Sequence, residues 1–384
     1  MTGFRLLRKV PVLALLLLGG CQIVPGGAAP RPAPVAEAGP VAQDPTPAAR
    51  RQVALLVPLS GTNAGVGTSI RNAAQLALAD AGEGSVNLLV FDTAALGAEG
   101  AARRALDAGA RLFLGPLTAE DARAVAPVAR QAGVPVVTFS NDRTVAGGGV
   151  YLLGFTPEQS VRRSIASARG EGARRFSALF PANEYGARAR AAFEGAVRDA
   201  GGEIAGVETY ERTSAGLADA VARLGRGPAA DAVLIADTGA IARAAAPALK
   251  RGPLRGARLL GTELWGNEDG LGRTPALVGA RFAAVPDAMF DSLERRYRER
   301  TGRTPYRLGS LGYDATLLAV RVSRDWRAGT AFPGARLLDA SGFSGVDGAF
   351  RFRPDGTAER ALAILEVTPT SERVVEPAAT GFGG

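Results

Sequence analysis

The stretch Ala54–Gly82, ALLVPLSGTNAGVGTSIRNAAQLALADAG, contains an apolar run, a loop with three glycines and a long alanine-rich segment in succession. This order predicts a buried strand, a turn and a helix. The loop matches neither nucleotide signature, Gly-x4-Gly-Lys-Ser/Thr or Gly-x-Gly-x-x-Gly. Two interpretations remain. Ser60, Gly61 and the amides beyond them could hold a small anion or carboxylate at the helix N-terminus, or the glycines only allow a tight turn.

The same succession of short apolar runs and helix-length amphipathic segments continues along the chain as far as residue 261. It predicts an α/β fold with two lobes, each a doubly wound, mainly parallel sheet with helices on both faces. The predicted strands are 53–57, 87–91, 111–115, 135–139, 176–180, 203–210, 232–236 and 258–261. The predicted helices are 67–81, 98–107, 119–131, 157–169, 185–200, 217–224 and 241–250.

The N-terminus has the pattern of an exported lipoprotein. Arg5, Arg8 and Lys9 precede the apolar run Val10–Leu18, which is shorter than the roughly 20 residues of a membrane span. Gly19 and Gly20 then precede Cys21, which resembles the lipobox of bacterial lipoproteins. We therefore expect a signal peptide over 1–20 and acylation of Cys21. Gln22, in place of Asp, resembles an outer-membrane address that faces the periplasm.

Residues 22–50 contain seven prolines and almost no large apolar side chains, so we expect no packed element there. With Cys21 they form either a tether of roughly 90 Å at most, at about 3.1 Å per residue, or a disordered leader without a spacing role.

The composition narrows the function. The chain has 384 residues, no histidine and one cysteine, which excludes an internal disulfide, a Ser-His-Asp triad and a zinc site with histidine. The formal net charge is +8, mostly from arginine. This modest excess on an exported chain argues against nucleic acid as a partner. We expect no enzymatic activity, no metal and no cofactor.

Polar residues gather at the carboxyl ends of the predicted strands, where ligands of such sheets bind. These loops are 58–61, 115–118, 140–144, 183–186, 237–239 and 262–266. The candidate cleft residues are Ser60, Gly61, Thr118, Ser140, Asp142, Arg143, Thr144, Tyr185, Asp237, Glu263 and Trp265. For Trp265, a cleft wall and a core aromatic are equal alternatives.

Several segments resemble the type 1 periplasmic binding proteins, the group of the branched-chain amino acid receptors. They include VPLSG (57–61), GPLTAEDARAVAPVARQAGVPVVTFS (115–140), PANEYGARARAAFEGAVRDAGGEI (181–204), GTELWG (261–266) and TGRTPYRLGSLGYDATLLA (301–319). Within that group, FSNDRTVAGGGVYLLGFTPEQSV (139–161) and FSGVDGAFRFRPDGTAERALAILEV (343–367) look most like the penicillin-binding protein activators.

The resemblance implies a bilobed, non-enzymatic protein with a central cleft. Lobe one would comprise 51–154 and 282–329, lobe two 155–281 and 330–375, and residues 376–384 a disordered tail. Some activators carry an additional N-terminal helical-repeat domain, and the Pro-rich segment stands in its place here.

The amino acid receptors bind the ligand carboxylate with hydroxyls and amides, and the ammonium with an acid from the other lobe. Thr118, Ser140 and Thr144 match the first role, and Asp237 or Glu263 the second. Asn141, Asp142 and Arg143 replace the small residues expected between Ser140 and Thr144. The Asp142 carboxylate would repel a ligand carboxylate, whereas Arg143 could attract it.

Two functions follow. The first is an outer-membrane lipoprotein that stimulates or scaffolds a peptidoglycan synthase, a bifunctional penicillin-binding protein, by protein contact. The alternative is a substrate-binding lipoprotein of an ABC transporter for amino acids or related amides.

Two segments near the C-terminal third carry lesser predictions. The arginine-rich segment 291–307 predicts a helix, either with a solvated face and internal ion pairs or in contact with an acidic polymer. Tyr313 and Asp314 in the next helix predict a structural role at the lobe interface.

Overall fold

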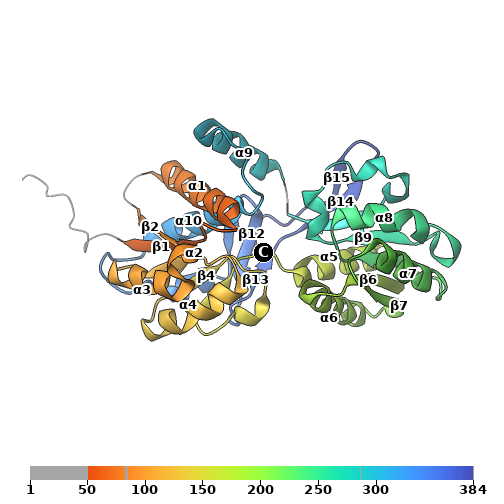
Figure 1. Cartoon of the computed structure of the whole chain (residues 1–384), viewed down its shortest axis with the longest axis horizontal. Coiled ribbons are helices and arrows are strands. Elements are labelled where there is room, and N and C mark those ends of the chain that lie inside the picture. The colour runs from red at the N-terminus through yellow and green to blue at the C-terminus, as the bar shows by residue number, and fades with distance from the viewer. Residues whose placement is uncertain (1–50, 83–84, 286, 384) are drawn as a thin grey trace, which may run out of the picture. The chain divides into compact units, whose positions relative to one another are not determined.

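Two mainly parallel sheets organise this protein, and each is covered by helices on both faces (Figure 1). The structure is a computed structural model that describes residues 51–82, 85–285 and 287–383. These residues belong to one compact unit, Pro45–Gly384. The predicted signal peptide, Cys21 and the tether lie outside the described residues. The α/β fold class predicted from the sequence is confirmed.

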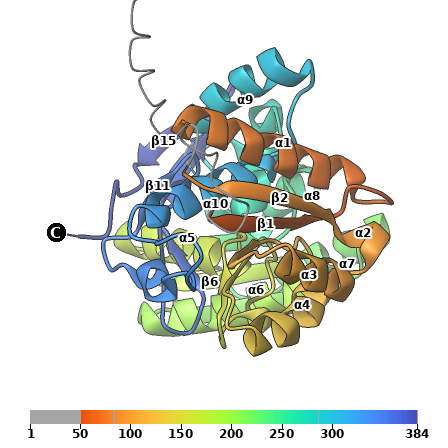
Figure 2. The same cartoon turned by 90° about the vertical axis from the view of Figure 1, so that its left-hand side faces the viewer.

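The sheet of lobe one has the strand order β2-β1-β3-β4-β5, and all its pairs are parallel. Its strands are β1 (Gln52–Val57), β2 (Asn87–Asp92), β3 (Leu112–Leu114), β4 (Val136–Thr138) and β5 (Val150–Leu152). Successive β1 side chains enter opposite cores. Val53 and Leu55 pack with α1 (Ala64–Ala81) and α10 (Gly309–Ser323). Ala54 and Leu56 pack with α3 (Ala98–Asp107) and α4 (Ala119–Gln131), on the other side of the sheet (Figure 2).

The sheet of lobe two has the order β15-β14-β10-β9-β8-β6-β7. Its strands are β6 (Arg175–Pro181), β7 (Glu203–Tyr210), β8 (Ala232–Ile235), β9 (Arg258–Gly261), β10 (Arg281–Ala284), β14 (Ala363–Val367) and β15 (Glu372–Glu376). Strand β14 pairs antiparallel with β10, and β15 pairs antiparallel with β14. These two strands extend a sheet that is otherwise parallel. Helices α5 (Pro157–Gly170) and α6 (Glu184–Asp199) cover one face. Helices α7 (Ser214–Gly225) and α8 (Gly239–Leu249) cover the other.

The chain crosses between the lobes at positions that differ from the expected boundaries at 281 and 330. Strand β10 pairs with β9 and β14, so the chain is still in lobe two as far as Ala284, beyond the expected boundary. A third sheet follows, formed by β11 (Phe343–Gly345), β12 (Gly348–Phe352) and β13 (Ala358–Arg360). Its phenylalanines join the core of α1 and α10, so residues as far as 360 belong to lobe one. Strands β14 and β15 return to lobe two, where β14 places Ala363, Leu365 and Val367 in the core and β15 pairs with β14 at the edge of the sheet.

The C-terminal tail also differs from the expectation of disorder. Residues 377–383 have no helix or strand, yet Ala378 packs against the core of lobe two. The Arg351 guanidinium lies over the Phe382 ring, 4.7 Å from its centroid, in lobe one. A cation–π contact with lobe one and an apolar contact with lobe two therefore hold the tail.

The helix predicted over 291–307 is α9 (Ala288–Thr301), which ends earlier than expected. Gly302 adopts the left-handed conformation, φ +68°, that stops a helix. Two of its arginines form ion pairs within the lobe, Arg296 with Asp80 and Arg298 with Glu294 at 2.6 Å. The remaining short elements are α2 (Thr93–Leu96) and the 3-10 turns Arg143–Val145, Gly252–Leu254, Glu263–Asn267, Leu271–Arg273, Pro275–Leu277 and Gly334–Leu338.

Candidate binding cleft

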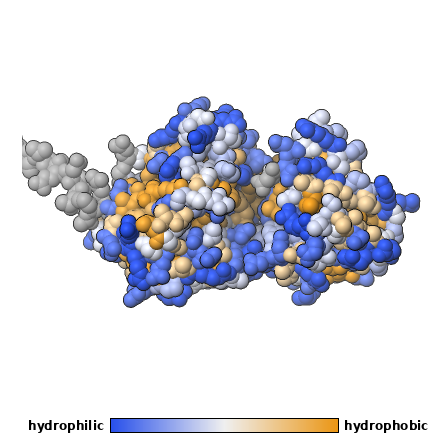
Figure 3. All heavy atoms as spheres, in the orientation of Figure 1, coloured by the Kyte–Doolittle hydropathy of each residue, from blue (hydrophilic) through white to orange (hydrophobic). Residues whose placement is uncertain are grey.

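A cavity of about 730 Å³ lies between the lobes, at the carboxyl ends of the central strands. The space-filling view shows the molecule hollowed there (Figure 3). The wall is mostly apolar, and its polar members come from both lobes. The lining residues are Asn63, Val66, Leu117, Thr118, Ala119, Phe139, Ser140, Asn141, Phe155, Glu263, Leu264, Gly266, Ala284, Val285, Asp287, Tyr306, Arg307 and Leu308.

Three of the residues predicted for the cleft line this cavity: Thr118, Ser140 and Glu263. The Thr118 hydroxyl accepts a hydrogen bond from the Asp121 N–H at 3.1 Å and so caps α4. The other predicted residues within the described chain lie outside the lining. They are Ser60, Gly61, Asp142, Arg143, Thr144, Tyr185, Asp237 and Trp265.

The loop from Ser140 to Thr144 is closed on itself. The Ser140 Oγ accepts a hydrogen bond from the Asp142 N–H at 3.1 Å. The Asp142 carboxylate accepts from the Thr144 N–H at 3.0 Å and from its hydroxyl at 2.8 Å. Thr144 therefore turns toward Asp142 and away from the cavity, because the loop forms a 3-10 turn that Asp142 caps.

Two arginines neutralise the Asp142 carboxylate. Arg123 donates to it at 2.6 Å, and Arg188 lies 3.6 Å from its other oxygen. Burial alone would raise the pKa of Asp142, but the hydrogen bonds from Thr144 and the charges of Arg188 and Arg123 hold it below its usual value. Arg188 belongs to α6 and also donates to the Asn141 carbonyl at 2.7 Å, so it joins lobe two to lobe one beside the cleft.

The predicted acids of lobe two are engaged inside the protein. Asp237 is 2% exposed and accepts hydrogen bonds from Tyr210 at 2.6 Å and Arg212 at 3.0 Å. Glu263 accepts hydrogen bonds from the Ser160 hydroxyl and, at 3.0 Å, from the Tyr185 hydroxyl. Burial raises the pKa of Glu263, and these hydrogen bonds oppose the rise. Tyr185 thus positions Glu263 from behind the cavity wall.

The glycine-containing loop after β1 directs the Ser60 hydroxyl away from the cleft. The Ser60 hydroxyl donates to Asp92 at 2.8 Å, and the Leu59 N–H donates to the same carboxylate at 2.9 Å. Gly67 has a packing role, since a Cβ there would lie 1.8 Å from the Pro58 carbonyl oxygen. A Cβ at Gly186, in lobe two, would lie at the same distance from the Pro181 carbonyl oxygen. These contacts favour the tight-turn interpretation over the anion site.

Trp265 is a core aromatic. It is fully buried, and its ring centroid lies 5.9 Å from that of Phe282. A Cβ at Gly261 would lie 2.2 Å from the Trp265 ring, so the glycine makes room for the indole. Of the two alternatives for this residue, the position in the core of lobe two is the one observed.

The sequence analysis missed several lining residues, including Phe155, Asp287, Tyr306 and Arg307. Arg307 pairs with the buried Asp347 at 2.5 Å and lies over the Phe290 ring at 4.0 Å. Its Nη2 has no hydrogen-bond partner among the described residues but lies 3.7 Å from a carboxylate oxygen of Asp287. Each of these residues lies beside a lobe crossing or directly before α10, and that position is the signal by which they could have been found.

A buried pair of acids adjoins Arg307. Asp314 of α10 accepts hydrogen bonds from the N–H groups of Val346 at 2.7 Å and Asp347 at 3.3 Å. Burial raises the pKa of Asp314 to about 7, and the charge of Asp347 adds to the rise. Asp314 is inside lobe one, where it fixes the turn between β11 and β12.

Among the described residues, no group of three or more His, Cys, Asp or Glu side chains could hold a metal ion. No helix in that part of the chain is long and apolar enough to cross a membrane.

Comparison with known proteins gives a family and a set of structural relatives. Residues 51–372 match the family model described as periplasmic binding protein. No curated protein matched the chain in sequence. A branched chain amino acid ABC transporter periplasmic ligand-binding protein from Burkholderia xenovorans is 17% identical, with a TM-score of 0.67, over 87% of this chain and 96% of that one.

LpoA of Haemophilus influenzae is a second relative. The full-length protein is 19% identical with a TM-score of 0.68, and the match covers 85% of this chain and 59% of LpoA. The LpoA C-domain, described as a regulator of PBP1A, is also 19% identical with a TM-score of 0.68, and 99% of it is covered. At these identities the relatives establish the shared fold.

Proposed function

The chain belongs to the periplasmic binding protein family, and we propose that it is a non-enzymatic envelope lipoprotein that regulates a peptidoglycan synthase by protein contact. The segments 139–161 and 343–367, which resemble the penicillin-binding protein activators, support this proposal. The extent of the match to the LpoA C-domain is compatible with it.

The observation that carries the proposal is the closed loop from Ser140 to Thr144. An amino acid receptor needs free hydroxyls and amides for the ligand carboxylate and a free acid for the ammonium. Here Thr144 and Asp142 bind each other, and Asp237 is engaged by Tyr210 and Arg212. The groups expected to hold an amino acid are largely used within the protein, which favours a scaffold over a receptor.

The proposed attachment uses Cys21. Two or more acyl chains would hold the protein firmly at a bilayer, and the segment 22–50 would let the folded lobes extend from the outer membrane toward the wall. We place the protein in the cell envelope, anchored in the outer membrane and facing the periplasm.

A synthase assay tests the regulatory function. The lipoprotein, purified in detergent, is added to each bifunctional penicillin-binding protein of the same cell, and binding, glycan polymerisation and peptide cross-linking are measured. We expect binding and faster synthesis with at least one of them. The double variant Thr118→Ala/Ser140→Ala should stimulate as well as wild type, since contact does not require the cleft. Absence of binding and stimulation with every synthase would refute the proposal.

The cavity itself favours a second candidate function, a receptor for a small ligand. It is large enough for one, its walls are mostly apolar, and Thr118, Ser140 and Arg307 supply polar groups in its lining. Such a ligand at about 100 times its dissociation constant adds roughly 2.7 kcal/mol of stability.

A thermal-shift screen of amino acids, amides and muropeptides tests this alternative. A ligand whose effect is lost in Ser140→Ala or Thr118→Ala would support the receptor. No shift with any compound at millimolar concentration would count against it.

A further inference from the structure

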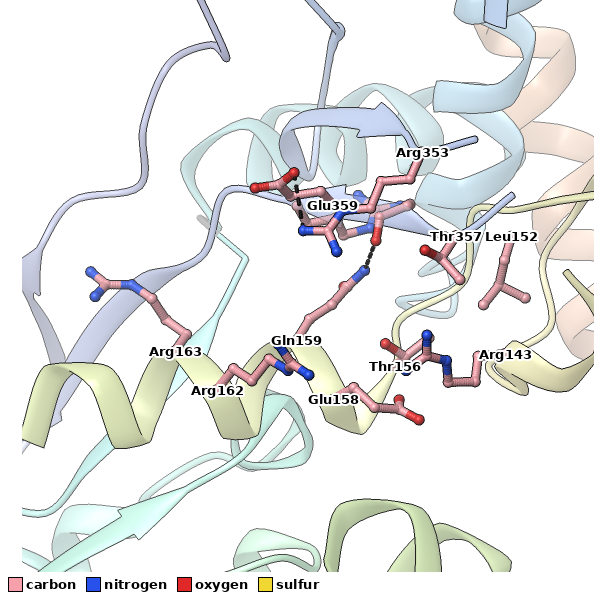
Figure 4. Close-up of a pocket in the computed structure, with 12 residues that line it drawn as sticks. Arg143, Leu152, Thr156, Glu158, Gln159, Arg162, Arg163, Arg353, Thr357 and Glu359 are labelled. Atoms are coloured by element: carbon pink, nitrogen blue, oxygen red, sulfur yellow. Dashed lines mark hydrogen bonds and ion pairs between the residues drawn. The ribbon is translucent and has the colours of Figure 1, made fainter. Parts of the chain in front are cut away.

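A second cavity, of about 330 Å³, lies beside the segments that join the lobes, and it shares no lining residue with the cleft. Figure 4 shows side chains of α5 on one side and of β13 and the preceding turn on the other. Lobe one and lobe two both contribute to it. Its lining consists of Arg143, Leu152, Thr156, Glu158, Gln159, Arg162, Arg163, Arg353, Thr357, Ala358, Glu359 and Arg360.

Five arginines and two glutamates line this hinge cavity, so arginine predominates among its charged lining residues. Arg353 is paired with Glu359 at 3.3 Å, and Arg163 with Glu376 at 2.8 Å. The side chain of Arg162 has neither a hydrogen bond nor an ion pair with any described residue.

Arg143 also retains donors for a ligand. Its one ion pair among the described residues, with Asp355, is as long as 4.0 Å. The cavity therefore has two guanidinium groups, one on each lobe, with free donors.

Arg360 adds a buried charge whose donors are not satisfied. It is 6% exposed, and its Nη2 donates to the Leu153 carbonyl at 2.6 Å. Its Nε and Nη1 have no hydrogen-bond partner among the described residues. The guanidinium lies 4.7 Å from the ring centroid of Phe155 and 5.3 Å from that of Phe350. A buried cation with unmet donors beside a cavity favours an anion in that cavity.

The first turn of α5 also favours an anion in this cavity. Thr156 precedes this 14-residue helix and makes no side-chain hydrogen bond to its N–H groups. Thr156, Glu158 and Gln159 line the cavity, so the N-terminal end of α5, the positive end of its helix dipole, lies at the cavity wall. Gln159 itself donates to the Ala358 carbonyl at 2.5 Å, which ties α5 to β13 across the hinge.

We propose that the hinge cavity binds a small anion with at least two negative charges, of the polycarboxylate or phosphate type, between Arg143 of lobe one and Arg162 of lobe two. Guanidinium groups bind both types through paired N–H donors. A ligand with charges at two points satisfies both arginines at once and stabilises the lobe orientation in which they face each other. A single acetate-sized charge reaches only one of them.

Glu158 should affect anion binding in the opposite direction to the arginines. It lines the cavity, its Oε2 has no hydrogen-bond partner among the described residues, and its charge repels an anion. Replacing Arg162 should weaken binding, whereas Glu158→Gln should strengthen it.

The test uses the full-length chain in a non-ionic detergent and isothermal titration calorimetry with citrate and with inorganic phosphate. Acetate at matched ionic strength is the control ligand. We expect one citrate or phosphate per chain, with a dissociation constant in the millimolar range or below. Arg143→Gln/Arg162→Gln should weaken binding at least tenfold, and Glu158→Gln should strengthen it about threefold.

The matched control variant is Arg226→Gln/Arg251→Gln, which removes two arginines of lobe two that lie at a separate surface groove. It should bind citrate as wild type does, and the melting temperature without ligand should show that every variant is folded. Equal responses to acetate and citrate, or equal losses in the hinge and control variants, would reveal a general ionic effect and overturn the proposal. Loss of citrate binding in Ser140→Ala alone would place the anion in the cleft and also overturn it.

Discussion

The buried carboxyl group of Asp314 should make the stability of lobe one depend on pH. Its ordinary pKa of 3.8 is raised to about 7, first by burial and then by Asp347, while Arg360 and two backbone N–H groups act in the opposite direction. Between these pH values the folded protein holds a proton that the unfolded chain has released. The raised pKa therefore favours the folded state at low pH, and this advantage is lost as pH rises toward 7.

The magnitude follows from 1.36 kcal/mol for each pH unit between the two pKa values. The full penalty above pH 7 is roughly 4 kcal/mol, of which roughly 3 kcal/mol develops between pH 5 and pH 8. Asp314→Asn is neutral at every pH and keeps one oxygen that can accept from Val346. The hydrogen bonds that the asparagine cannot make lower the stability of this variant by an amount that does not change with pH. Relative to wild type, its free energy of unfolding should therefore rise by roughly 3 kcal/mol from pH 5 to pH 8.

Urea unfolding followed by tryptophan fluorescence measures this difference. The chain has two tryptophans, Trp326 in the core of lobe one and Trp265 in that of lobe two. A Trp265→Phe background thus reports on lobe one alone. Asp199→Asn, an exposed acid on α6, is the matched control and should follow wild type at every pH. A difference between Asp314→Asn and wild type that stays constant from pH 5 to pH 8 would refute the reasoning.

Three further predictions concern packing, the lobe contact and the anchor. Gly67→Ala should lower the free energy of unfolding by about 3 kcal/mol, because its Cβ would meet the Pro58 oxygen at 1.8 Å; the open helix site Gly100→Ala should instead gain about 0.5–1 kcal/mol by urea unfolding. Arg188→Ala should remove a lobe-to-lobe hydrogen bond of about 1.5–3 kcal/mol and increase the radius of gyration in solution scattering; an unchanged radius would contradict this. Cys21→Ser should abolish palmitate labelling and release the protein from membranes or block its processing; wild-type protein found soluble, cleaved after residue 20 and unmodified at Cys21 would disprove acylation.

The sequence by itself determined most of the secondary structure as far as β9. Continuous apolar runs such as 53–57 and 232–236 fill strands that are buried on both faces, so their signal is local and strong. Boundaries moved where a cap or a glycine decided them. Thr213 caps α7 and starts it at Ser214, earlier than predicted, and Gly302 ends α9.

The candidate site was predictable as a set of loops but not as a set of contacts. Strand ends identified Thr118, Ser140 and Glu263 because parallel strands bring their carboxyl ends to one edge. Whether a hydroxyl faces the cavity depends on its partners, and those come from elsewhere in the chain. Asp142 is engaged by Arg123 of α4 and Arg188 of α6, and Glu263 by Tyr185.

Only the tertiary structure decided how the lobes share the last hundred residues. Phe343, Phe350 and Phe352 have the same alternating pattern whether they complete one core or the other, so periodicity cannot assign them. Their packing against α10 and the pairing of β14 with β10 make that choice. The same crossing places Arg143 and Arg162, 19 positions apart in sequence, in the lining of one cavity between two lobes. Long-range packing creates this site, and for that reason local sequence patterns do not reveal it.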